Sequence, residues 1–600
     1  MDRRPVIGFV LIFLLIIGYP LLMNKLSPPR PQPVKPAATA TAPATTTTTA
    51  ETPQASPAAA ATGIGQQVDP LLPPAPLTLA QMLEPAPSTS APAIVTVTTP
   101  LYRARIDTRG GAVVGWELLK HKSWRGGPVQ VVPQEVPFAG ADQVTFREAK
   151  LDLATFPFTA DRTEVSLAAG GQKQQVVLRG LTRGGLEVAK VFTFDPATYG
   201  VHVDIRLGGE ATAAGAMLLQ TGPADAITFG WNKGIAQIER LEKQERPNLL
   251  SFAALGEDTH TFKRESLRKN VEKVTGQWRG SVRFAGLQDR YFTVIGIVPR
   301  GQGGPVEATV RLGGDQAHLV QTWAIELPAR RDNGAAIGEA GLDLYIGPQQ
   351  AELLVAYSQG LEKTIGLNVP SWMRWARPLT TLVLWGMELM HKVVPNYGVI
   401  IIIFAVLTKL MFYPLTKKST ESMRKMQELQ PKMKALQEKY KNDKEKLNQA
   451  TLKLYQEEKI NPLSGCLPLL VQSPVFIALY QAFSVSVSLR GQPFFGWIHD
   501  LSQPDALFAL PFALPFLGAD FNVLPLLMGI AMYVQTKFTP NTGGGQMAAM
   551  NAMMPVLMIV FFYNVPSGLT LYWLINNVMQ AYQSWQIHRT TPKVGGVATA

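Results

Sequence analysis

Short runs of alternating apolar and polar residues fill the chain from residue 94 to about residue 347. Runs at 93–98, 174–178, 188–194 and 201–207 have this period of two, and glycine pairs separate many of them. Strands that bury one face follow this pattern, and frequent turn residues are typical of a many-stranded sandwich. We therefore predict a β-sandwich domain over residues 93–365.

The chain begins with a basic stretch that leads into an uncharged run. Arg3 and Arg4 precede residues 6–23, which contain no charged side chain. This run is long for a cleavable signal peptide, and no small-x-small cleavage site follows it. We predict an uncleaved transmembrane signal-anchor over residues 1–26, with a cleavable signal peptide as the alternative. Residues 27–92 are rich in Pro, Ala and Thr, which predicts a disordered linker.

Longer apolar segments dominate the last third of the chain. Residues 379–394 carry a charged stripe, which suits an interfacial amphipathic helix assigned to residues 366–395. A true span there would reverse the sidedness of every later segment. Five segments then predict an α-helical transmembrane bundle, the five-helix core of residues 396–590. These segments are 397–415, 466–487, 521–538, 547–563 and 568–586.

A basic block occupies residues 417–460 between the first two of these segments. Apolar side chains recur there at three- and four-residue spacing from Met426 to Tyr440, and Pro431 and Asn442 interrupt the pattern. We predict a cytoplasmic helical hairpin whose first half holds Met423, Met426, Leu429 and Pro431. A plain solvated connector and a platform that touches ribosome or client are both open interpretations.

The basic block also orients the chain, because loops rich in Lys and Arg stay in the cytoplasm. The β-sandwich then lies in the periplasm, and both termini, including the short tail of residues 591–600, lie in the cytoplasm. The net charge of +12 comes with apolar spans on both sides of the block, which favours a membrane protein over nucleic-acid binding.

Lys409 is the one charged residue within the segment 397–415. An ionisable group at that depth costs about 2.5–3.5 kcal/mol on insertion scales, so it calls for a partner or a function. A lysine that snorkels is the alternative, because Lys417 lies only ~12 Å further along a helix. Asn576, Asn577 and Gln580 fall on one side of the last segment, where they either line a groove or hold helices together.

Catalytic signatures are missing from the sequence. His121, His202 and His260 lack the spacing of metal ligands, and no HExxH, GxSxG or Walker-type motif occurs. Cys466 is the only cysteine, which excludes an intramolecular disulfide. We therefore expect no enzymatic activity, no metal and no cofactor.

Several motifs in a fixed order, from about residue 370 to residue 589, resemble the YidC/Oxa/Alb family of membrane insertases. They include Asn396-Tyr-Gly, Tyr413-Pro-Leu-Thr-Lys-Lys, Asn461-Pro-Leu-Ser-Gly-Cys-Leu-Pro, Gln472-Ser-Pro-Val-Phe and Pro566-Ser-Gly. The β-rich half is similar to the periplasmic domain of the Gram-negative members at Asp289-Arg-Tyr-Phe and Leu344-Tyr-Ile-Gly-Pro.

This resemblance implies an insertase and chaperone for newly made inner-membrane proteins, acting alone or with the Sec translocon. Members place a cation in a hydrophilic groove open to cytoplasm and lipid, and Lys409 holds that position here, where Arg is commoner. The groove and client contacts implied are Lys409, Gln472, Tyr480, Gln535, Tyr572, Trp573 and Asn576. Gln535 and Trp573 are expected to face the cation.

The implied partners are nascent membrane proteins, the Sec translocon and membrane lipids, with the ribosome and the signal recognition receptor at the hairpin. We expect no direct nucleic-acid readout. A solute transporter or channel with a sugar-binding periplasmic domain is the competing interpretation. That function needs a pore open on both sides and usually inverted repeats, whereas the five segments show no internal symmetry.

Overall fold

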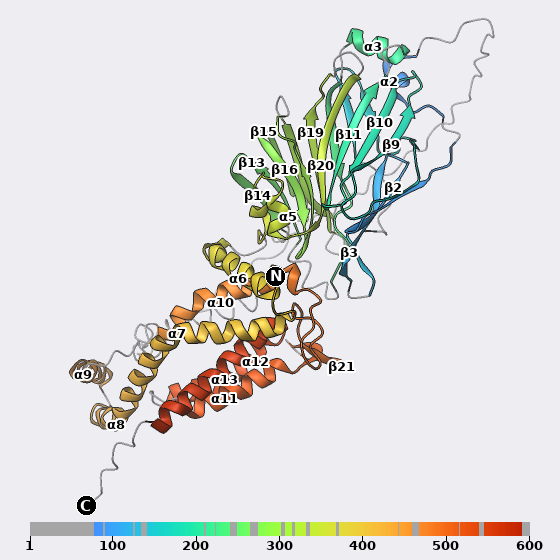
Figure 1. Cartoon of the computed structure of the whole chain (residues 1–600). Helices are drawn as coiled ribbons and strands as arrows, with labels where there is room; N and C mark the ends of the chain where they lie inside the picture. Colours follow the sequence, from blue (N-terminus) through green and yellow to red (C-terminus); the bar gives the residue numbers. More distant parts are fainter. Residues whose placement is uncertain are drawn as a thin grey trace, which may run out of the picture. The chain divides into compact units, whose positions relative to one another are not determined.

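The computed structural model (Figure 1) describes residues 77–590, with gaps at 88–89, 124–125, 134–140, 209–211, 222–223, 240–248, 264–273, 302–305, 315–318, 332–335, 368–370, 442, 459–466, 515–516 and 539–544. The predicted signal-anchor, most of the linker and the C-terminal tail lie outside the described residues.

Alternating residues build a β-rich domain of three sheets in the described part of the chain. The first sheet has the order β4 (Pro128–Gln130), β3 (Ala112–Lys122), β2 (Tyr102–Asp107), β1 (Ile94–Thr98) and β8 (Glu164–Ser166). The second has the order β14 (Asp258–Lys263), β13 (Leu250–Leu255), β16 (Val282–Gln288), β17 (Phe292–Ile297), β20 (Ala336–Pro348), β11 (Gly200–Gly208), β10 (Glu187–Phe194), β9 (Gln174–Leu181) and β7 (Thr159–Ala160). The third has the order β15 (Val274–Gly280), β18 (Val306–Gly314), β19 (Leu319–Pro328), β12 (Ala224–Trp231), β5 (Gln143–Phe146) and β6 (Lys150–Asp152).

Period-two burial holds these sheets together. Strand β1, for example, buries Val95 and Val97 while the residues between them stay partly exposed. Strands β16 and β20 of the second sheet contact β18, β19 and β12 of the third, so the two sheets share one apolar core. The prediction of a β-rich domain is confirmed.

The β-rich domain begins earlier than expected. Residues 79–83 form helix α2 (Leu79–Leu83), whose Leu79 and Leu83 are buried in the core of the domain. Pro85 then forms a β-bridge with Thr182. The prediction that the disordered linker extends to residue 92 is therefore wrong for residues 79–85, because two leucines within one helical turn attach this segment to the core.

The remaining helices cover the edges of the sheets and form the C-terminal region. The short ones are α3 (Ala213–Thr221), α5 (Ala351–Val355) and the 3-10 turns η3 (Leu361–Thr364), η4 (Ser371–Ala376) and η6 (Val487–Leu489). The others are α6 (Arg377–His391), α7 (Tyr397–Glu428), α8 (Gln430–Lys439), α9 (Lys444–Glu457), α10 (Leu467–Val485), α11 (Leu524–Phe538), α12 (Gly545–Phe562) and α13 (Ser567–Thr590). A small hairpin, β21 (Ala506–Leu514) and β22 (Gly518–Asn522), lies between α10 and α11.

One stretch of helix within these described residues, Tyr397–Lys417, is long and apolar enough to cross a membrane. Shorter apolar stretches occur at Leu524–Thr536 and Met553–Phe562. The helical character of the C-terminal region is confirmed, whereas the number of spans stays a prediction.

Helix α7 continues well past the predicted segment end at residue 415. Asn396 begins it by accepting hydrogen bonds from the backbone N–H groups of Gly398 (2.9 Å) and Val399 (3.2 Å). The helix then runs through Pro414 to Glu428 without a break. The helix ends before Leu429, two residues earlier than the break expected at Pro431. Pro431 lies in the first turn of α8, where its missing N–H group costs no hydrogen bond.

Helix α11 starts later than predicted. Phe521 belongs to β22, and the helix begins at Leu524 rather than at residue 521. The carboxylate of Asp505 accepts hydrogen bonds from the N–H groups of Val523 (2.9 Å) and Leu524 (2.6 Å). This cap comes from a residue far back in the chain, so local sequence spacing did not reveal it.

Helix α6 presents an apolar face outward. Leu382, Trp385 and Leu389 are exposed at helical spacing, whereas Val383 and Met387 on the opposite side are buried. An exposed apolar stripe of this kind is typical of a helix that lies along a membrane interface.

His202 on strand β11 lies between two carboxylates of the β-rich domain, Asp204 and Asp343. Its Nε2 lies 3.1 Å from Asp204 and its Nδ1 lies 2.6 Å from Asp343 on β20. The hydrogen bonds to Asp204 and Asp343 raise the pKa of His202 to about 10, above its ordinary value of 6.5.

This raised pKa predicts the direction of the pH effect. The stabilisation by His202 is fully present below about pH 6.5 and is lost as the pH rises through about 10. In thermal unfolding of the full chain, the advantage over His202→Gln should shrink over that window, from about 1 kcal/mol for a partly exposed group. An advantage that does not change with pH would show that this pair of carboxylates does not stabilise the protonated ring.

Candidate functional site: a polar seam between α7 and α13

Lys409 lies in the middle of the apolar part of α7 and is half-buried. Its Nζ donates a hydrogen bond to Oε1 of Gln580 on α13. An ammonium group has three N–H donors. Gln580 is its one hydrogen-bond partner among the residues that the structure describes, so the cation still has capacity to bind water or a polar ligand.

The partner of Lys409 belongs to a polar stripe along α13. Tyr572, Asn576, Gln580 and Gln583 follow one another at intervals of four, four and three residues, which places them on one face of the helix. Tyr572, Asn576 and Gln583 are buried. Polar side chains on a buried face require partners across the interface, and α7 is one of the helices that contacts α13.

Helix α7 supplies matching polar groups. Oγ1 of Thr408 lies 3.5 Å from the hydroxyl of Tyr572. About two turns beyond Lys409 on α7, Oγ1 of Thr416 accepts a hydrogen bond from Nε2 of Gln583 at 3.4 Å. We call the set Thr408, Lys409, Thr416, Tyr572, Asn576, Gln580 and Gln583 the polar seam.

Helix α10 closes one side of the polar seam through Gln472. Nε2 of Gln472 donates to Oδ1 of Asn576 at 3.5 Å, and Nδ2 of Asn576 donates to the carbonyl oxygen of Tyr572 at 2.9 Å. Three helices therefore meet at this stripe. Gln472, Tyr572, Asn576 and Lys409, four of the residues that the sequence resemblance implied, lie within it or in contact with it.

Beyond Tyr572 the contact between α7 and α13 becomes apolar. Ile400, Ile401 and Ala405 on α7 are buried, and so are Leu569 and Leu571 on α13. Gly568 brings the two helices together, since a Cβ there would lie 3.1 Å from Cδ1 of Ile401. The polar seam thus ends near the first turns of α7 and extends toward the end from which α8 and α9 follow.

Trp573 belongs to an aromatic cluster, and its expected position facing Lys409 stays a prediction. Its ring contacts Phe476 of α10 (4.9 Å between centroids) and Phe562 of α12 (5.3 Å). Tyr480 is half-buried near the same cluster, 6.5 Å from Phe476. Gln535 lies in the last turn of α11, a helix that contacts both α12 and α13. Gln580, which the sequence placed with Asn576 and Asn577 as either groove lining or a contact between helices, is the hydrogen-bond partner of the cation.

Helices α8 and α9 contact each other and form a helical hairpin, whose cytoplasmic position stays a prediction. Leu429 is buried against Leu454 and Tyr455, and Lys432 forms a 2.6 Å ion pair with Glu458. Asp443 caps α9 by accepting from the N–H of Lys446 at 3.0 Å. Pro431 is exposed in the first turn of α8. For Met423 and Met426 the structure describes the backbone alone, at the end of α7.

A buried polar junction joins the β-rich domain to the helical region. Nε of Arg490, which follows α10, lies 2.6 Å from Oε1 of Glu239, and both side chains are about 95% buried, at 5% and 6% exposure. Gln503 donates to the other oxygen of Glu239 at 2.9 Å. From the domain side, Nε of Arg290 donates to the carbonyl oxygen of Ser484 at 2.8 Å.

Two titratable groups beside this junction have strongly shifted pKa values. Burial raises the pKa of Asp289 to about 7, against the backbone hydrogen bonds from Phe292 and Tyr291 that lower it. Burial also lowers the pKa of His121 to about 4, and the nearby charge of Arg490 acts in the same direction. His121 is therefore neutral at physiological pH and does not add a second positive charge beside Arg490, whose carboxylate partner is Glu239.

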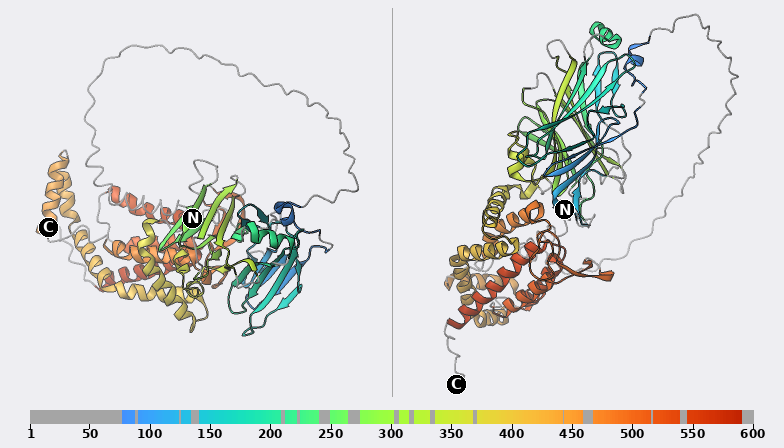
Figure 2. Two further views of the ribbon diagram at one scale, coloured as in Figure 1. Left: turned by 90° about the horizontal axis from the view of Figure 1, so that it is seen from above. Right: turned by 45° about the vertical axis from the view of Figure 1, so that its right-hand side comes forward.

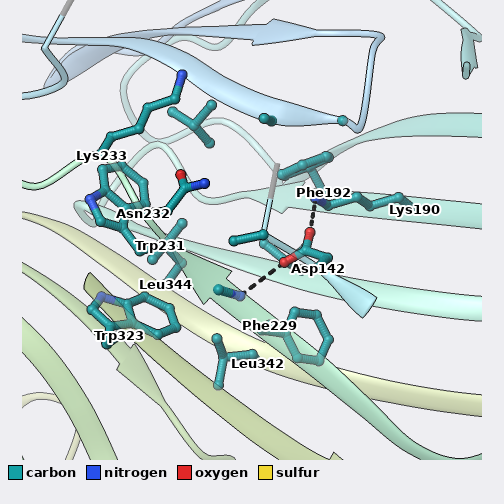
Figure 3. Close-up of a pocket in the computed structure, with 16 residues that line it drawn as sticks. Asp142, Lys190, Phe192, Phe229, Trp231, Asn232, Lys233, Trp323, Leu342 and Leu344 are labelled. Atoms are coloured by element: carbon teal, nitrogen blue, oxygen red, sulfur yellow. Dashed lines mark hydrogen bonds and ion pairs between the residues drawn. The ribbon is translucent and has the colours of Figure 1, made fainter. Parts of the chain in front are cut away.

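A small cavity lies inside the β-rich domain (Figure 3). It is lined by the ion pair of Lys190 with Asp142 and by the rings of Trp231 and Trp323, among others. Oδ1 of Asp142 also accepts from the N–H of Gly230 at 3.0 Å. The volume of the cavity is about 60 Å³, far below the roughly 300–1,000 Å³ of typical small-molecule sites. This cavity gives no support to a sugar-binding domain.

Two family models match most of the chain. Residues 94–382 match the YidC periplasmic domain, and residues 389–594 match the 60Kd inner membrane protein. The chain is 32% identical over 520 residues to the membrane protein insertase YidC of Pelobacter propionicus, which covers 84% of this chain and 89% of the relative. It is 30% identical over 601 residues to the protein of the same name from Syntrophus aciditrophicus, which covers 98% and 100%.

Among solved structures, a crystal structure of an active YidC insertase with its first transmembrane domain resolved covers 84% of this chain and 96% of its own, at 18% identity and a TM-score of 0.35. The family models define the class, an inner-membrane protein with a periplasmic β-rich domain. The chain belongs to the YidC family of membrane protein insertases. The resemblance seen in the motifs is thereby confirmed.

Proposed function

We propose that this protein inserts newly made proteins into the inner membrane, and that the polar seam is the path by which a hydrophilic client segment enters the membrane. The single observation that carries the proposal is the half-buried ammonium of Lys409 in an apolar helix. The hydrogen bond that the structure describes for this ammonium goes to Gln580. Unpaired polar groups in hydrocarbon cost several kcal/mol each, and donors placed partway across lower that barrier.

The two ends of the polar seam suggest a direction. With the hairpin α8–α9 in the cytoplasm, the polar end near Thr416 and Gln583 faces the cytoplasm, and the apolar contact near Ile401 and Leu569 closes the periplasmic side. A client segment then enters from the cytoplasm, with acidic residues favoured by the cation. Its apolar stretch of about 20 residues moves sideways into lipid, and burial of that stretch drives release.

The further parts of the proposal rest on the same placement. The N-terminal anchor and five helices of the core span the membrane, α6 lies along its surface, the β-rich domain is periplasmic and both termini are cytoplasmic. The hairpin is the contact for the ribosome and the signal recognition receptor, and the chain acts as a chaperone alone or beside the Sec translocon. The basic residues of the hairpin and the exposed apolar face of α6 support these assignments.

Site-specific crosslinking to a stalled nascent chain tests the path. Photoreactive residues at Gln472, Tyr480 and Trp573 should crosslink to a short single-span client in ribosome-bound complexes with the full-length protein. Ile530 on α11 is the matched control, because its side chain is exposed on an apolar helix face. Crosslinks of equal yield from Ile530, or none from the three test positions, would refute the path.

A further inference from the structure

The hairpin of β21 and β22 exposes apolar side chains on both of its faces. Leu507, Phe508 and Phe512 are exposed by 50%, 51% and 60% of their surface. Consecutive residues of β21, Leu507 and Phe508 among them, are exposed, so the strand does not bury one face in a core. Strands β1 and β11 of the β-rich domain differ, because they bury alternate residues in a core. Figures 1 and 2 show the two strands projecting from the helices instead of lying between them.

The composition of this hairpin is unusual for a loop outside a membrane. Residues 506–519 contain no charged side chain, whereas Asp505 and Asp520 stand immediately at either end. An apolar two-stranded ribbon in water is marginal in stability and prone to pair with other strands. The apolar surface of the hairpin therefore needs to be shielded from water. Asp505 and Asp520 mark the two ends of the part that is shielded.

The base of the hairpin is fixed to the ends of the helices. Asp505 caps α11 and also accepts a hydrogen bond from the indole N–H of Trp497 at 3.0 Å. At the other strand, Nδ2 of Asn522 donates to the carbonyl oxygen of Tyr563 at 2.7 Å, just after α12. The hydroxyl of Tyr563 donates to the carbonyl oxygen of Asp520 at 3.0 Å. Trp and Tyr with polar partners are typical of the boundary between lipid and water.

From this placement we infer that the β21–β22 hairpin is a membrane-surface anchor, which inserts Leu507, Phe508 and Phe512 into the lipid interface beside the first turns of α11. Lipid is the partner of the hairpin, because the chain continues from the hairpin into α11, which exposes the apolar residues Leu527 and Ile530. The two free edges of a two-stranded ribbon carry unpaired backbone groups, which keep the hairpin at the interface and out of the hydrocarbon centre. The inference needs a membrane location but not the proposed client path.

Fluorescence quenching in lipid nanodiscs that hold one copy of the full-length protein tests the inference. In a Cys466→Ser background, Phe512→Cys is labelled with an environment-sensitive fluorophore. We expect blue-shifted emission, strong quenching by a nitroxide near the headgroup end of the lipid acyl chains, and weak quenching by aqueous iodide. His499→Cys, at an exposed position of the same loop, is the matched control and should show the reverse pattern.

The possible outcomes separate lipid from other covers. Iodide quenching at Phe512→Cys that equals the control would overturn the inference, since the hairpin would then lie in water. Protection from both quenchers would also overturn it, because the hairpin would then be covered by protein. Leu507→Cys is a second position in case Phe512→Cys lowers the yield of folded protein, and the same lipid-quenching pattern is expected there.

Discussion

Replacing Lys409 by glutamate is expected to reduce membrane insertion of a client with acidic residues in its translocated segment by about tenfold or more. At roughly 6 Å and an effective dielectric constant of about 20, a pair of charges interacts by about 3 kcal/mol, and each 1.4 kcal/mol is a factor of ten. The variant turns an attraction into a repulsion and removes the donor to Gln580. Insertion is measured as protection of the client from protease in proteoliposomes.

Matched variants separate charge from structure. Lys409→Arg keeps the cation and should stay close to wild type, although a guanidinium is a rigid fork where an ammonium is a compact point charge. Lys409→Met removes the charge at similar size and should lie between wild type and Lys409→Glu. Lys417→Glu changes an exposed residue on the same helix and should have little effect. Normal insertion by Lys409→Glu would contradict an electrostatic role of the cation.

Glu239→Ala is expected to lower the free energy of unfolding by about 3–5 kcal/mol, because it leaves the guanidinium of Arg490 buried without a carboxylate. Arg490 would keep its 2.7 Å hydrogen bond to the carbonyl oxygen of Lys122, and Gln503 would lose its acceptor. The effect is measured by denaturation of the full-length protein in nanodiscs. Limited proteolysis should show earlier cleavage between the β-rich domain and α6.

The double variant Glu239→Leu with Arg490→Met provides the control. Apolar groups of similar volume avoid the unpaired charge, so this variant should recover most of the lost stability. Insertion per folded molecule should stay near wild type in both variants, because the polar seam shares no residue with this junction. An unchanged unfolding free energy in Glu239→Ala would show that Arg490 does not depend on this carboxylate.

The two charged sites have different surroundings. Arg490 is buried and has its carboxylate and carbonyl partners within 3 Å, as a structural ion pair requires. Lys409 is half-buried and its described partner is a neutral amide. A buried cation without a carboxylate is costly, so its retention in an apolar helix is best explained by a function.

Local pattern in the sequence indicated most of the long elements and the position of the cation. Period-two runs predicted the strands of the β-rich domain, and long apolar segments predicted helices α7 and α10 to α13. Lys409 stood out because no other charge occurs in its segment. These features depend on residues close together in the chain, where burial on one face imposes a fixed spacing.

Only the tertiary structure decided which residues meet. The pairing of Lys409 with Gln580 spans 171 positions, and the junction of Arg490 with Glu239 spans 251. The cap from Asp505 moved the start of α11, and the β21–β22 hairpin arose within a segment that showed only as a loop. Helix rotation and strand pairing bring distant side chains together, and no local period records them, so the sequence alone determined the parts while contacts across the fold determined the site.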